Sequence, residues 1–334
     1  YNSGSAAVTL TGLRNEGTVS AGANYLDSAE GQNSRVLGQF FGGIAGYCKD
    51  VTLRGSTSTT RRDMTETQLK TAVKGGYAAN GTLTDDSPLK GDFVGGLVGF
   101  ASGCTLENCT TQKGYVLGRC FVGGMAGGFS GSEFETTGGS NSSTVLGNRY
   151  VGGVVSVNGS QSTVSGVTNS GLVAGLGKNA AYVGGIAGLN DADWGSTAAN
   201  TTATIKNCVS SMASDAATNS SRSALLQALS TYKNVSGEEA TARTAYVGGL
   251  VGRNGKNAVL TWDKDATTVQ IGAVISGNMP VAGTDGTVFT IKGTTTSGGT
   301  AGTFTTTAKA GRIKADGLAG GIIGYNCLLA SAPN

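Results

Sequence analysis

The chain offers few side chains for catalysis. Its 334 residues include no histidine, so the commonest general base is missing, and neither a Ser-His-Asp nor a Cys-His arrangement can form within it. Clustered carboxylates remain, because many glycoside hydrolases work with paired Asp and Glu. The candidate groups are Asp85 with Asp86, Asp191 with Asp193, Glu238 with Glu239, and Asp263 with Asp265. Each lies in an expected turn or insertion, where acidic residues commonly cap backbone groups. We therefore predict that the chain is not an enzyme.

Metal, nucleotide and nucleic-acid sites are weakly indicated. Asp191-x-Asp193 and Asp263-x-Asp265 could contact calcium, but neither is followed by the further oxygen ligands of a recognisable loop. Zinc is not expected without histidine or a Cys-x-x-Cys pair. Gly95-Gly96-x-x-Gly99 resembles a phosphate-binding loop, yet the pattern recurs and no helix pattern follows it. The net charge is +3 and the basic residues are scattered, so we expect no cofactor, no nucleic-acid partner and no direct membrane insertion.

The cysteines permit several structures. Six cysteines allow about fifteen pairings. Cys48 and Cys104 each closely follow a glycine-rich phrase, in blocks expected to be neighbours, and we predict a possible disulfide between them. Cys104 with Cys109 is an alternative pair. Cys109 and Cys208 both follow an Asn in similar phrases, where a buried unpaired thiol is the simpler interpretation.

A short glycine phrase, in which an aromatic or apolar residue precedes two glycines, recurs along the chain and must position all these side chains. Its first residue and two glycines are Phe40, Gly42 and Gly43; Phe93, Gly95 and Gly96; Phe121, Gly123 and Gly124; Tyr150, Gly152 and Gly153; Tyr182, Gly184 and Gly185; Tyr246, Gly248 and Gly249; and Leu318, Gly320 and Gly321. Such self-similarity indicates one supersecondary unit stacked on itself. The aromatic residue and the aliphatic residue two after the first glycine are predicted to share one interior strand face. The glycines are predicted to allow a bend or close backbone approach.

The spacing of the phrases predicts the size of the unit. The first glycines are separated by 53, 28, 29, 32, 64 and 72 residues, so the short intervals indicate a repeat of about thirty residues and the long ones contain insertions. A second pattern, an apolar residue followed two positions later by Asn, occurs at Asn15, Asn108, Asn169 and Asn207. Asn suits a turn and can stack between repeats, so these four residues are predicted to align as a ladder.

The recurring phrase resembles the repeat motif of a known family. The phrase (Tyr/Phe)-Val-Gly-Gly-(Leu/Ile/Val)-x-Gly, preceded by an apolar-x-Asn-Cys strand, resembles the GLUG motif over seven blocks from about residue 40 to 325. The resemblance implies a β-solenoid region of a large secreted bacterial protein, such as a surface adhesin or the repeat region of immunoglobulin-A-cleaving metallopeptidases. The chain departs from the motif at Ser156, Leu318 and Ala319.

We therefore predict an all-β fold, a parallel β-solenoid or β-helix of about thirty-residue coils with short helical insertions. Residues 1–255 would form the solenoid, with helices near 63–75 and 221–233. In the first, Asp-x-x-Glu, spaced apolar residues and a following Gly suggest a capped helix, and the Ala- and Leu-rich run from Ser223 to Ser230 suggests the second. Residues 256–316 would be a Thr- and Gly-rich β insertion or degenerate coils, in which the strands around Thr290 and Phe304 suggest a hairpin. Residues 317–334 would form the final coil.

Composition favours an extracellular structural role. Glycine accounts for 57 residues, only 13% are charged, and hydrophobic residues make up 38%, so the chain is folded rather than disordered. It begins at Tyr1 without Met, and we expect a segment whose signal and anchor lie elsewhere. The predicted function is a stalk or adhesin of the bacterial surface that binds host protein or glycan. One alternative is a subunit that joins copies of itself end to end in a filament, because neither end looks like a polar cap. A carbohydrate-active solenoid enzyme ranks third.

Overall fold

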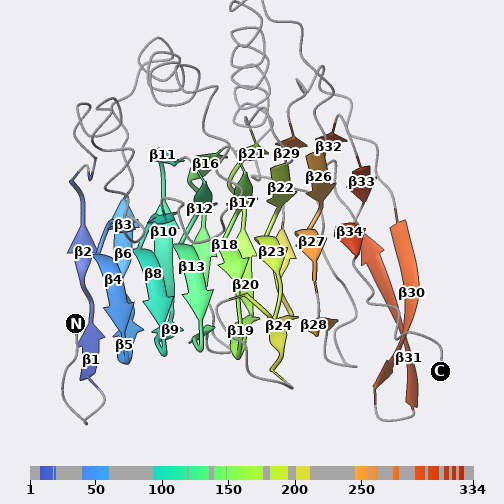
Figure 1. Ribbon diagram of the computed structural model, residues 1–334, viewed down its shortest axis with the longest axis horizontal. Coiled ribbons are helices and arrows are strands. Elements are labelled where there is room, and N and C mark those ends of the chain that lie inside the picture. Colours follow the sequence, from blue (N-terminus) through green and yellow to red (C-terminus); the bar gives the residue numbers. More distant parts are fainter. Residues whose placement is uncertain are drawn as a thin grey trace, which may run out of the picture.

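The computed structural model describes residues 8–17, 19, 40–59, 93–118, 120–134, 139–147, 149–175, 181–194, 201–210, 245–255, 257–261, 274–277, 290–297, 300–307, 312–315, 318–320 and 323–326. Every regular element in these ranges is a β-strand, which confirms the all-β prediction. The two expected helical insertions, near 63–75 and 221–233, lie outside the described residues. The strands lie side by side along the long axis of the molecule (Figure 1).

Five parallel sheets contain nearly all of the strands. Sheet 1 contains, in order, β1 (Val8–Thr11), β5 (Val51–Arg54), β9 (Thr105–Glu107), β14 (Glu133–Phe134), β19 (Ser162–Ser165), β24 (Ala203–Lys206) and β28 (Ala258–Thr261). Sheet 2 contains β2 (Arg14–Asn15), β6 (Thr57–Thr59), β10 (Cys109–Gln112), β15 (Gly139–Asn141), β20 (Val167–Asn169) and β25 (Val209–Ser210). Sheet 3 contains β11 (Tyr115–Leu117), β16 (Thr144–Gly147), β21 (Val173–Gly175), β29 (Val274–Gly277) and β32 (Arg312–Ala315).

The glycine phrases supply the other two parallel sheets. Sheet 4 contains β3 (Phe40–Gly42), β7 (Phe93–Gly95), β12 (Phe121–Gly123), β17 (Tyr150–Gly152), β22 (Ala181–Gly184), β26 (Ala245–Gly248) and β33 (Leu318–Gly320). Sheet 5 contains β4 (Ala45–Lys49), β8 (Val98–Ser102), β13 (Ala126–Ser130), β18 (Val155–Asn158), β23 (Ala187–Asn190), β27 (Val251–Asn254) and β34 (Ile323–Asn326). One repeat, β9 to β13, visits sheets 1 to 5 in succession before the chain returns to sheet 1 at β14.

The register pairs equivalent positions of successive phrases. We call each set of residues that pair through a sheet a column. The first residues of the seven phrases form one such column, Phe40, Phe93, Phe121, Tyr150, Tyr182, Tyr246 and Leu318. The first glycines, from Gly42 to Gly248 and Gly320, form another. The recurrence in the sequence is therefore a stack in space.

The region 256–316 departs from this regular order. Its strand β28 joins sheet 1, whereas β29 and β32 both join sheet 3, where β29 follows β21 directly. Between β29 and β32, strands β30 (Thr290–Ser297) and β31 (Thr300–Thr307) form a separate antiparallel hairpin, in which Ile291 pairs with Thr306. The segment thus supplies strands to the parallel sheets and also carries an inserted hairpin.

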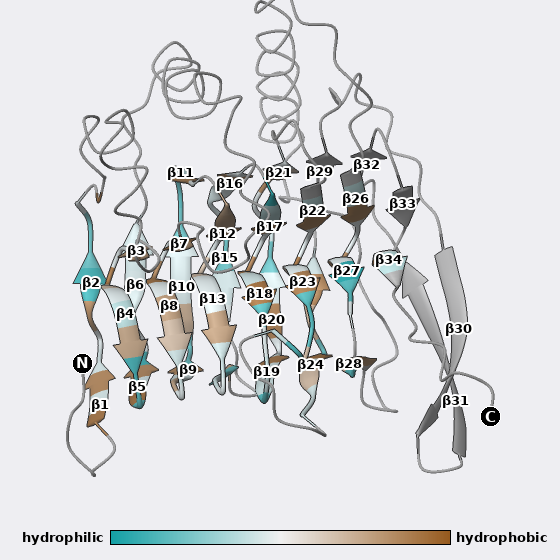
Figure 2. Cartoon of the chain, viewed as in Figure 1, coloured by the Kyte–Doolittle hydropathy of each residue, from teal (hydrophilic) through white to brown (hydrophobic). Residues whose placement is uncertain are grey.

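Among the described residues, buried apolar side chains form three hydrophobic clusters. The largest joins sheet 1 to the residues that follow the glycine pairs, such as Leu106 with Met125. The second joins the central valines of sheet 4 to valines of sheet 3, such as Val122 with Val145. The third is aromatic and includes Phe121. Apolar segments recur in the strands of sheet 5, among them β8 and β18, which lie on either side of β13 (Figure 2).

One prediction about the phrase is wrong. Phe121 and Met125 were expected to share one strand face and one interior, but they lie in different clusters. The reason is that the phrase is not a single strand: β12 ends at Gly123 and β13 begins at Ala126, in a different sheet. The glycine pair is the bend between two sheets, as the bend prediction required.

Candidate functional site

The two glycines of each phrase are required by two different close approaches. A Cβ on Gly123 would collide with the carbonyl oxygen of Ala126, across the tight bend. A Cβ on Gly124 would collide with the carbonyl oxygen of Gly153 in the next repeat and lie 2.5 Å from Nδ2 of Asn141. Backbone cannot move aside as a flexible side chain can, so both positions require glycine.

The second glycines face a column of small polar side chains. Asn15, Ser58, Thr111, Asn141, Asn169 and Ser210 form this column in sheet 2. Asn141 Nδ2 donates to Asn169 Oδ1 at 2.9 Å, and each Asn also receives the backbone N–H two residues on. A larger residue in this column would strike the glycine backbone, which explains why short polar side chains recur there.

The third glycine of the phrase lies against the strand of the preceding repeat. A Cβ on Gly127, Gly188 or Gly252 would come within about 2.6 Å of a backbone nitrogen in the neighbouring strand of sheet 4. Ser156 occupies this position in the fourth phrase, fully buried, and its hydroxyl has no hydrogen-bond partner. A buried hydroxyl without a partner costs roughly 1–3 kcal/mol of stability.

We expect Ser156→Ala to stabilise the protein by about 1 kcal/mol, because it removes the unpaired hydroxyl and keeps the Cβ that the structure already accommodates. Urea unfolding of the variant and the parent, followed by circular dichroism, measures the difference. A lower stability of the variant would show that the hydroxyl has a partner, such as an ordered water.

The first residues of the phrases form a stack of aromatic rings. Ring centroids along the column lie 5.5, 4.5, 4.9, 5.2 and 5.1 Å apart from Phe40 to Tyr246, and the planes of Phe121 and Tyr150 differ by only 2°. Stacked rings of this kind contribute beyond the area they bury. Parallel stacking turns ring edges, not faces, toward solvent. The column is therefore suited to rigidity rather than to stacking on a planar ligand.

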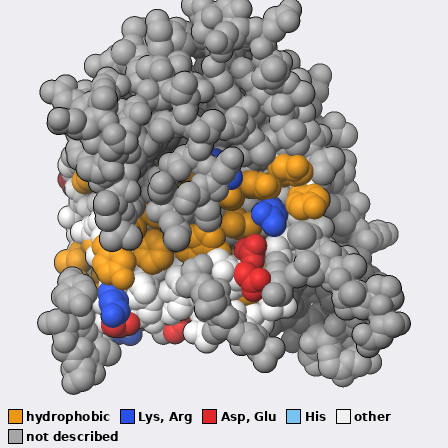
Figure 3. Space-filling view, in the orientation of Figure 1, with side chains coloured by type: hydrophobic (Ala, Val, Ile, Leu, Met, Phe, Trp, Pro, Cys, Tyr) orange, Lys and Arg blue, Asp and Glu red, His pale blue; other side chains and the backbone are white. Residues whose placement is uncertain are grey.

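Trp194 covers part of this stack and was missed in the sequence. It lies in the turn after β23, and its ring centroid is 5.9 Å from Phe93, 5.8 Å from Phe100 and 6.0 Å from Phe121. Gly128, which pairs with Phe100, leaves that column without a side chain, and a Cβ there would lie 2.5 Å from the Phe100 ring. Apolar side chains form a band across this face, with charged side chains near its margin (Figure 3).

A second ladder of asparagines lies in sheet 5. Asn158 Nδ2 donates to Asn190 Oδ1 at 2.8 Å, and Asn190 Nδ2 donates to Asn254 Oδ1 at 2.9 Å. The same amides also donate to carbonyl oxygens of sheet 1, from Asn158 to Thr204 at 3.0 Å and from Asn190 to Val259 at 3.3 Å. The ladder therefore ties successive repeats to one another and sheet 5 to sheet 1.

The predicted ladder of Asn15, Asn108, Asn169 and Asn207 is wrong in its membership. Asn15 and Asn169 do share the polar column of sheet 2. Asn108 and Asn207 instead occupy turns after strands of sheet 1, with φ of 50° and 53°. Asn tolerates this left-handed conformation better than most residues. The same sequence pattern thus serves two structural positions.

The cysteines are free thiols in the described residues. Cys48 and Cys104 are both buried in the largest cluster and their side chains are hydrogen-bonded to each other. That bond and burial raise the pKa of the Cys48 thiol. The same bond lowers the pKa of Cys104 to about 7, although burial acts in the opposite direction. Cys109 begins strand β10 and Cys208 immediately precedes strand β25, both in the part of the chain that forms sheet 2, and each thiol contacts backbone oxygens. Burial raises the pKa of Cys208 to about 12. Their prediction as buried unpaired thiols is confirmed.

The Cys48–Cys104 disulfide stays a prediction with a direct test. On incubation with oxidised glutathione, we expect Cys104, as the better thiolate, to form a mixed disulfide that Cys48 resolves, releasing reduced glutathione. Proteolysis and mass spectrometry without reductant should then recover a peptide pair that joins these two residues. Cys208 should stay reduced: it is as buried as Cys104, but burial raises its pKa to about 12, whereas the pKa of Cys104 is lowered. Recovery of glutathione adducts alone would contradict the pairing.

The carboxylates do not gather in the part of the chain that the structure describes, where no three His, Cys, Asp or Glu residues form a cluster suited to a metal ion. Asp191 accepts the backbone N–H of Asp193 at 3.1 Å, as a turn-capping residue does. Asp85, Asp86, Glu238, Glu239, Asp263 and Asp265 lie outside the described residues, as does Gly321.

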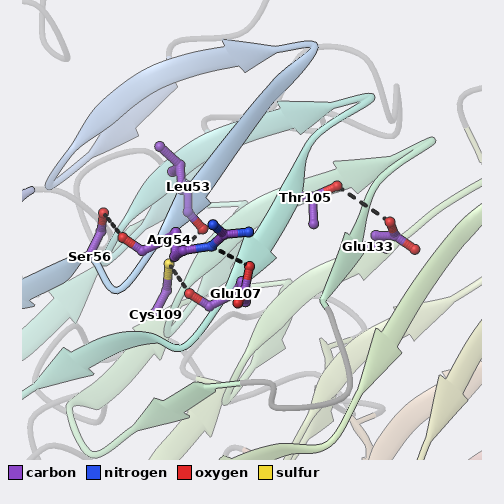
Figure 4. Close-up of polar contacts among 7 residues, drawn as sticks. All are labelled: Leu53, Arg54, Ser56, Thr105, Glu107, Cys109 and Glu133. Atoms are coloured by element: carbon purple, nitrogen blue, oxygen red, sulfur yellow. Dashed lines mark hydrogen bonds and ion pairs between the residues drawn. The ribbon is translucent and has the colours of Figure 1, made fainter. Parts of the chain in front are cut away.

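The outer face of sheet 1 carries ordinary surface contacts. Arg54 Nε donates to Glu107 Oε2 at 2.6 Å across neighbouring strands, and Thr105 contacts Glu133 at 3.4 Å (Figure 4). Exposed pairs of this kind contribute little stability. Within the described ranges, no helix is long and apolar enough to cross a bilayer.

Comparisons with protein-family models, curated proteins and solved structures found no match to the chain. Its interpretation therefore rests on the columns described above.

Proposed function

We propose that the chain is a β-solenoid with coils of about thirty residues, belonging with the GLUG-motif repeats, and that it acts as a non-catalytic stalk or adhesin of an extracellular bacterial surface protein. The observation that carries the proposal is the common register of sheets 1, 4 and 5, to each of which every described repeat adds one strand, with sheets 2 and 3 following the same parallel order. Such an array grows by addition and makes a stiff body of adjustable length. Its function then lies in what it spans or displays, and the expected partners are a host protein or glycan.

The stacked side chains support a mechanical role. Aromatic rings, asparagine amides and backbone hydrogen bonds all run along the direction in which the repeats stack. Each column continues from repeat to repeat, so force along the stack is shared among many small contacts.

Duplication of one repeat tests this proposal. Inserting a second copy of residues 121–149 before Tyr150 adds one rung in register, because Phe121 and Tyr150 are successive members of one column. We expect the variant to fold and to lengthen by about 4.8 Å, the spacing between neighbouring strands. Small-angle scattering measures the length and circular dichroism the fold. Inserting the same segment after Ser156, out of register, is the control and should unfold the molecule. Unfolding of the in-register variant would overturn the solenoid.

A filament subunit is the second candidate. It is favoured by the exposed apolar side chains Leu10 and Tyr47 in the first described repeat and Tyr325 in the last.

A further inference from the structure

Two arginines lie against one pair of stacked tyrosines. The Cζ atom of Arg149 is 5.2 Å from the centroid of the Tyr150 ring, and that of Arg253 is 5.6 Å from the centroid of the Tyr182 ring. The two rings are successive members of the aromatic column, with centroids 5.2 Å apart and planes that differ by 13°. Both guanidinium groups therefore flank the same pair of rings, and we call these four residues the arginine–tyrosine cluster.

Each arginine differs in type from the residues at equivalent positions. Arg253 lies in β27, in a column of sheet 5 whose other members are uncharged, namely Tyr47, Phe100, Gly128, Val157, Leu189 and Tyr325. Arg149 immediately precedes a glycine phrase, and none of the six residues that precede the other phrases is basic. A partly buried cation loses hydration that an apolar side chain does not need. Packing alone therefore does not account for the two arginines.

The aromatic column changes from phenylalanine to tyrosine at the same repeats. Its first three members are phenylalanines, and the next three are Tyr150, Tyr182 and Tyr246. The tyrosine rings remain stacked, with successive centroids 5.2 and 5.1 Å apart, so the change adds a row of hydroxyl groups at the ring edges. Hydroxyl and guanidinium groups thus occur together in one part of the stack.

The two positive charges act at one place. Burial raises the pKa of the Tyr150 hydroxyl, and the charges of Arg149 and Arg253 act in the opposite direction. The arginines come from different sheets, since Arg149 directly precedes β17 of sheet 4 and Arg253 lies in β27 of sheet 5. Both arginines and Tyr182 are partly exposed. A guanidinium group has five N–H donors in a planar fork, more than one contact uses.

We propose that the arginine–tyrosine cluster binds an acidic polysaccharide, whose carboxylate or sulfate group accepts hydrogen bonds from Arg149 and Arg253. This inference deepens the proposed adhesive role and rests on it. Planar guanidinium groups suit the paired oxygens of either anion. The regular row of tyrosine hydroxyls, continued by Tyr246, matches a polymer that repeats its own hydroxyl groups. Nucleic acid is a poorer fit, because its binding depends on many phosphate contacts rather than on two cations.

Three polysaccharides and two matched variants test the proposal by isothermal titration calorimetry at physiological salt. Hyaluronan oligosaccharides carry carboxylates, dextran sulfate carries sulfates, and dextran carries neither. The parent should bind at least one of the two charged polymers and not dextran, and the polymer that binds identifies the anion. In Arg149→Gln/Arg253→Gln the affinity for that polymer should fall by at least about tenfold, because charge-assisted hydrogen bonds are lost. The control Arg14→Gln/Lys206→Gln removes two positive charges from sheets 2 and 1 and should bind like the parent, because salt screens distant charges.

Other results would overturn the proposal. Failure of the parent to bind either charged polymer, or an equal loss in the control variant, excludes the site and leaves the solenoid, which the repeat duplication tests separately. Equal binding of dextran would mean that the arginines do not recognise the ligand. Should the glutamine variant fail to fold, phenylglyoxal modification of the parent decides. The bound polymer should protect Arg149 and Arg253 and leave Arg14 reactive, as peptide mass spectrometry measures, and unchanged modification of Arg149 and Arg253 counts against the site.

Discussion

Gly124→Ala should destabilise the protein by about 4 kcal/mol or more, enough to unfold the central repeats. The added methyl group would collide with the carbonyl oxygen of Gly153 and with the Asn141 side chain, which is itself held by hydrogen bonds to Asn169 and Ser143. To relieve this collision, the bends at Gly124 and Gly153 would have to move apart, or the Asn141 side chain would have to leave its column in sheet 2. Urea unfolding followed by circular dichroism measures the loss.

A matched glycine shows whether the effect comes from the collision. Gly17 is exposed, and the nearest atom to a Cβ there is Asn15 Oδ1 at 3.5 Å, an ordinary contact. Gly17→Ala should therefore change the free energy of unfolding by no more than about 0.5 kcal/mol. Equal stability of the Gly124 and Gly17 variants would mean that the repeats are not stacked as the register requires.

The amino-acid sequence alone predicted those features of the fold that follow from the repetition of the phrase. Seven copies of one phrase predicted that Phe121 and Tyr150 occupy the same place in successive units, and the register bears this out. Alternation along a strand did not predict which cluster each side chain enters. Gly123 and Gly124 end the strand instead of continuing it, so a period of two does not apply across them.

The distance of a residue from the glycine phrase gave the wrong column where the segments that connect two sheets differ in length between repeats. Asn108 and Asn169 both stand fifteen residues before the first glycine of a phrase, at Gly123 and Gly184, yet Asn169 shares a column with Thr111 rather than with Asn108. The third repeat runs from Thr111 to Gly123 in fewer residues than the fifth runs from Asn169 to Gly184. Distance from a motif fixes a column only where the intervening segments match.

The buried ladder of sheet 5 did have a signal in the sequence. Asn158 and Asn190 stand six residues after Gly152 and Gly184, the first glycines of their phrases, and nothing of variable length intervenes. Trp194 had no comparable signal, because it lies beyond the phrase and covers rings from repeats that precede it. Contacts that skip repeats follow from three-dimensional packing and not from periodicity.

Asn190→Asp should destabilise the protein by about 3–5 kcal/mol at neutral pH, and the loss should shrink in acid. Asn190 is fully buried, and its Nδ2 donates to Asn254 Oδ1 and to the carbonyl oxygen of Val259. An ionised Asp would put a carboxylate oxygen against these two acceptors. A protonated Asp can still donate to Asn254 Oδ1 and accept from Asn158 Nδ2, and loses only one of the ladder's hydrogen bonds.

The direction of the pH dependence follows from these states. Burial beside acceptors raises the pKa of the folded Asp above its unfolded value of about 3.9, because both effects disfavour the charged form. The folded variant then holds a proton that the unfolded chain releases, so its deficit relative to the parent is largest above the folded pKa and smallest below about pH 4. Urea unfolding of the variant and the parent at a series of pH values measures the difference in their free energies of unfolding. Groups that titrate alike in both proteins contribute nothing to this difference. Asn257→Asp, at an exposed turn, should show little deficit at any pH. A deficit for Asn190→Asp that does not change with pH would mean that position 190 is reached by water and that the ladder does not lie in the interior.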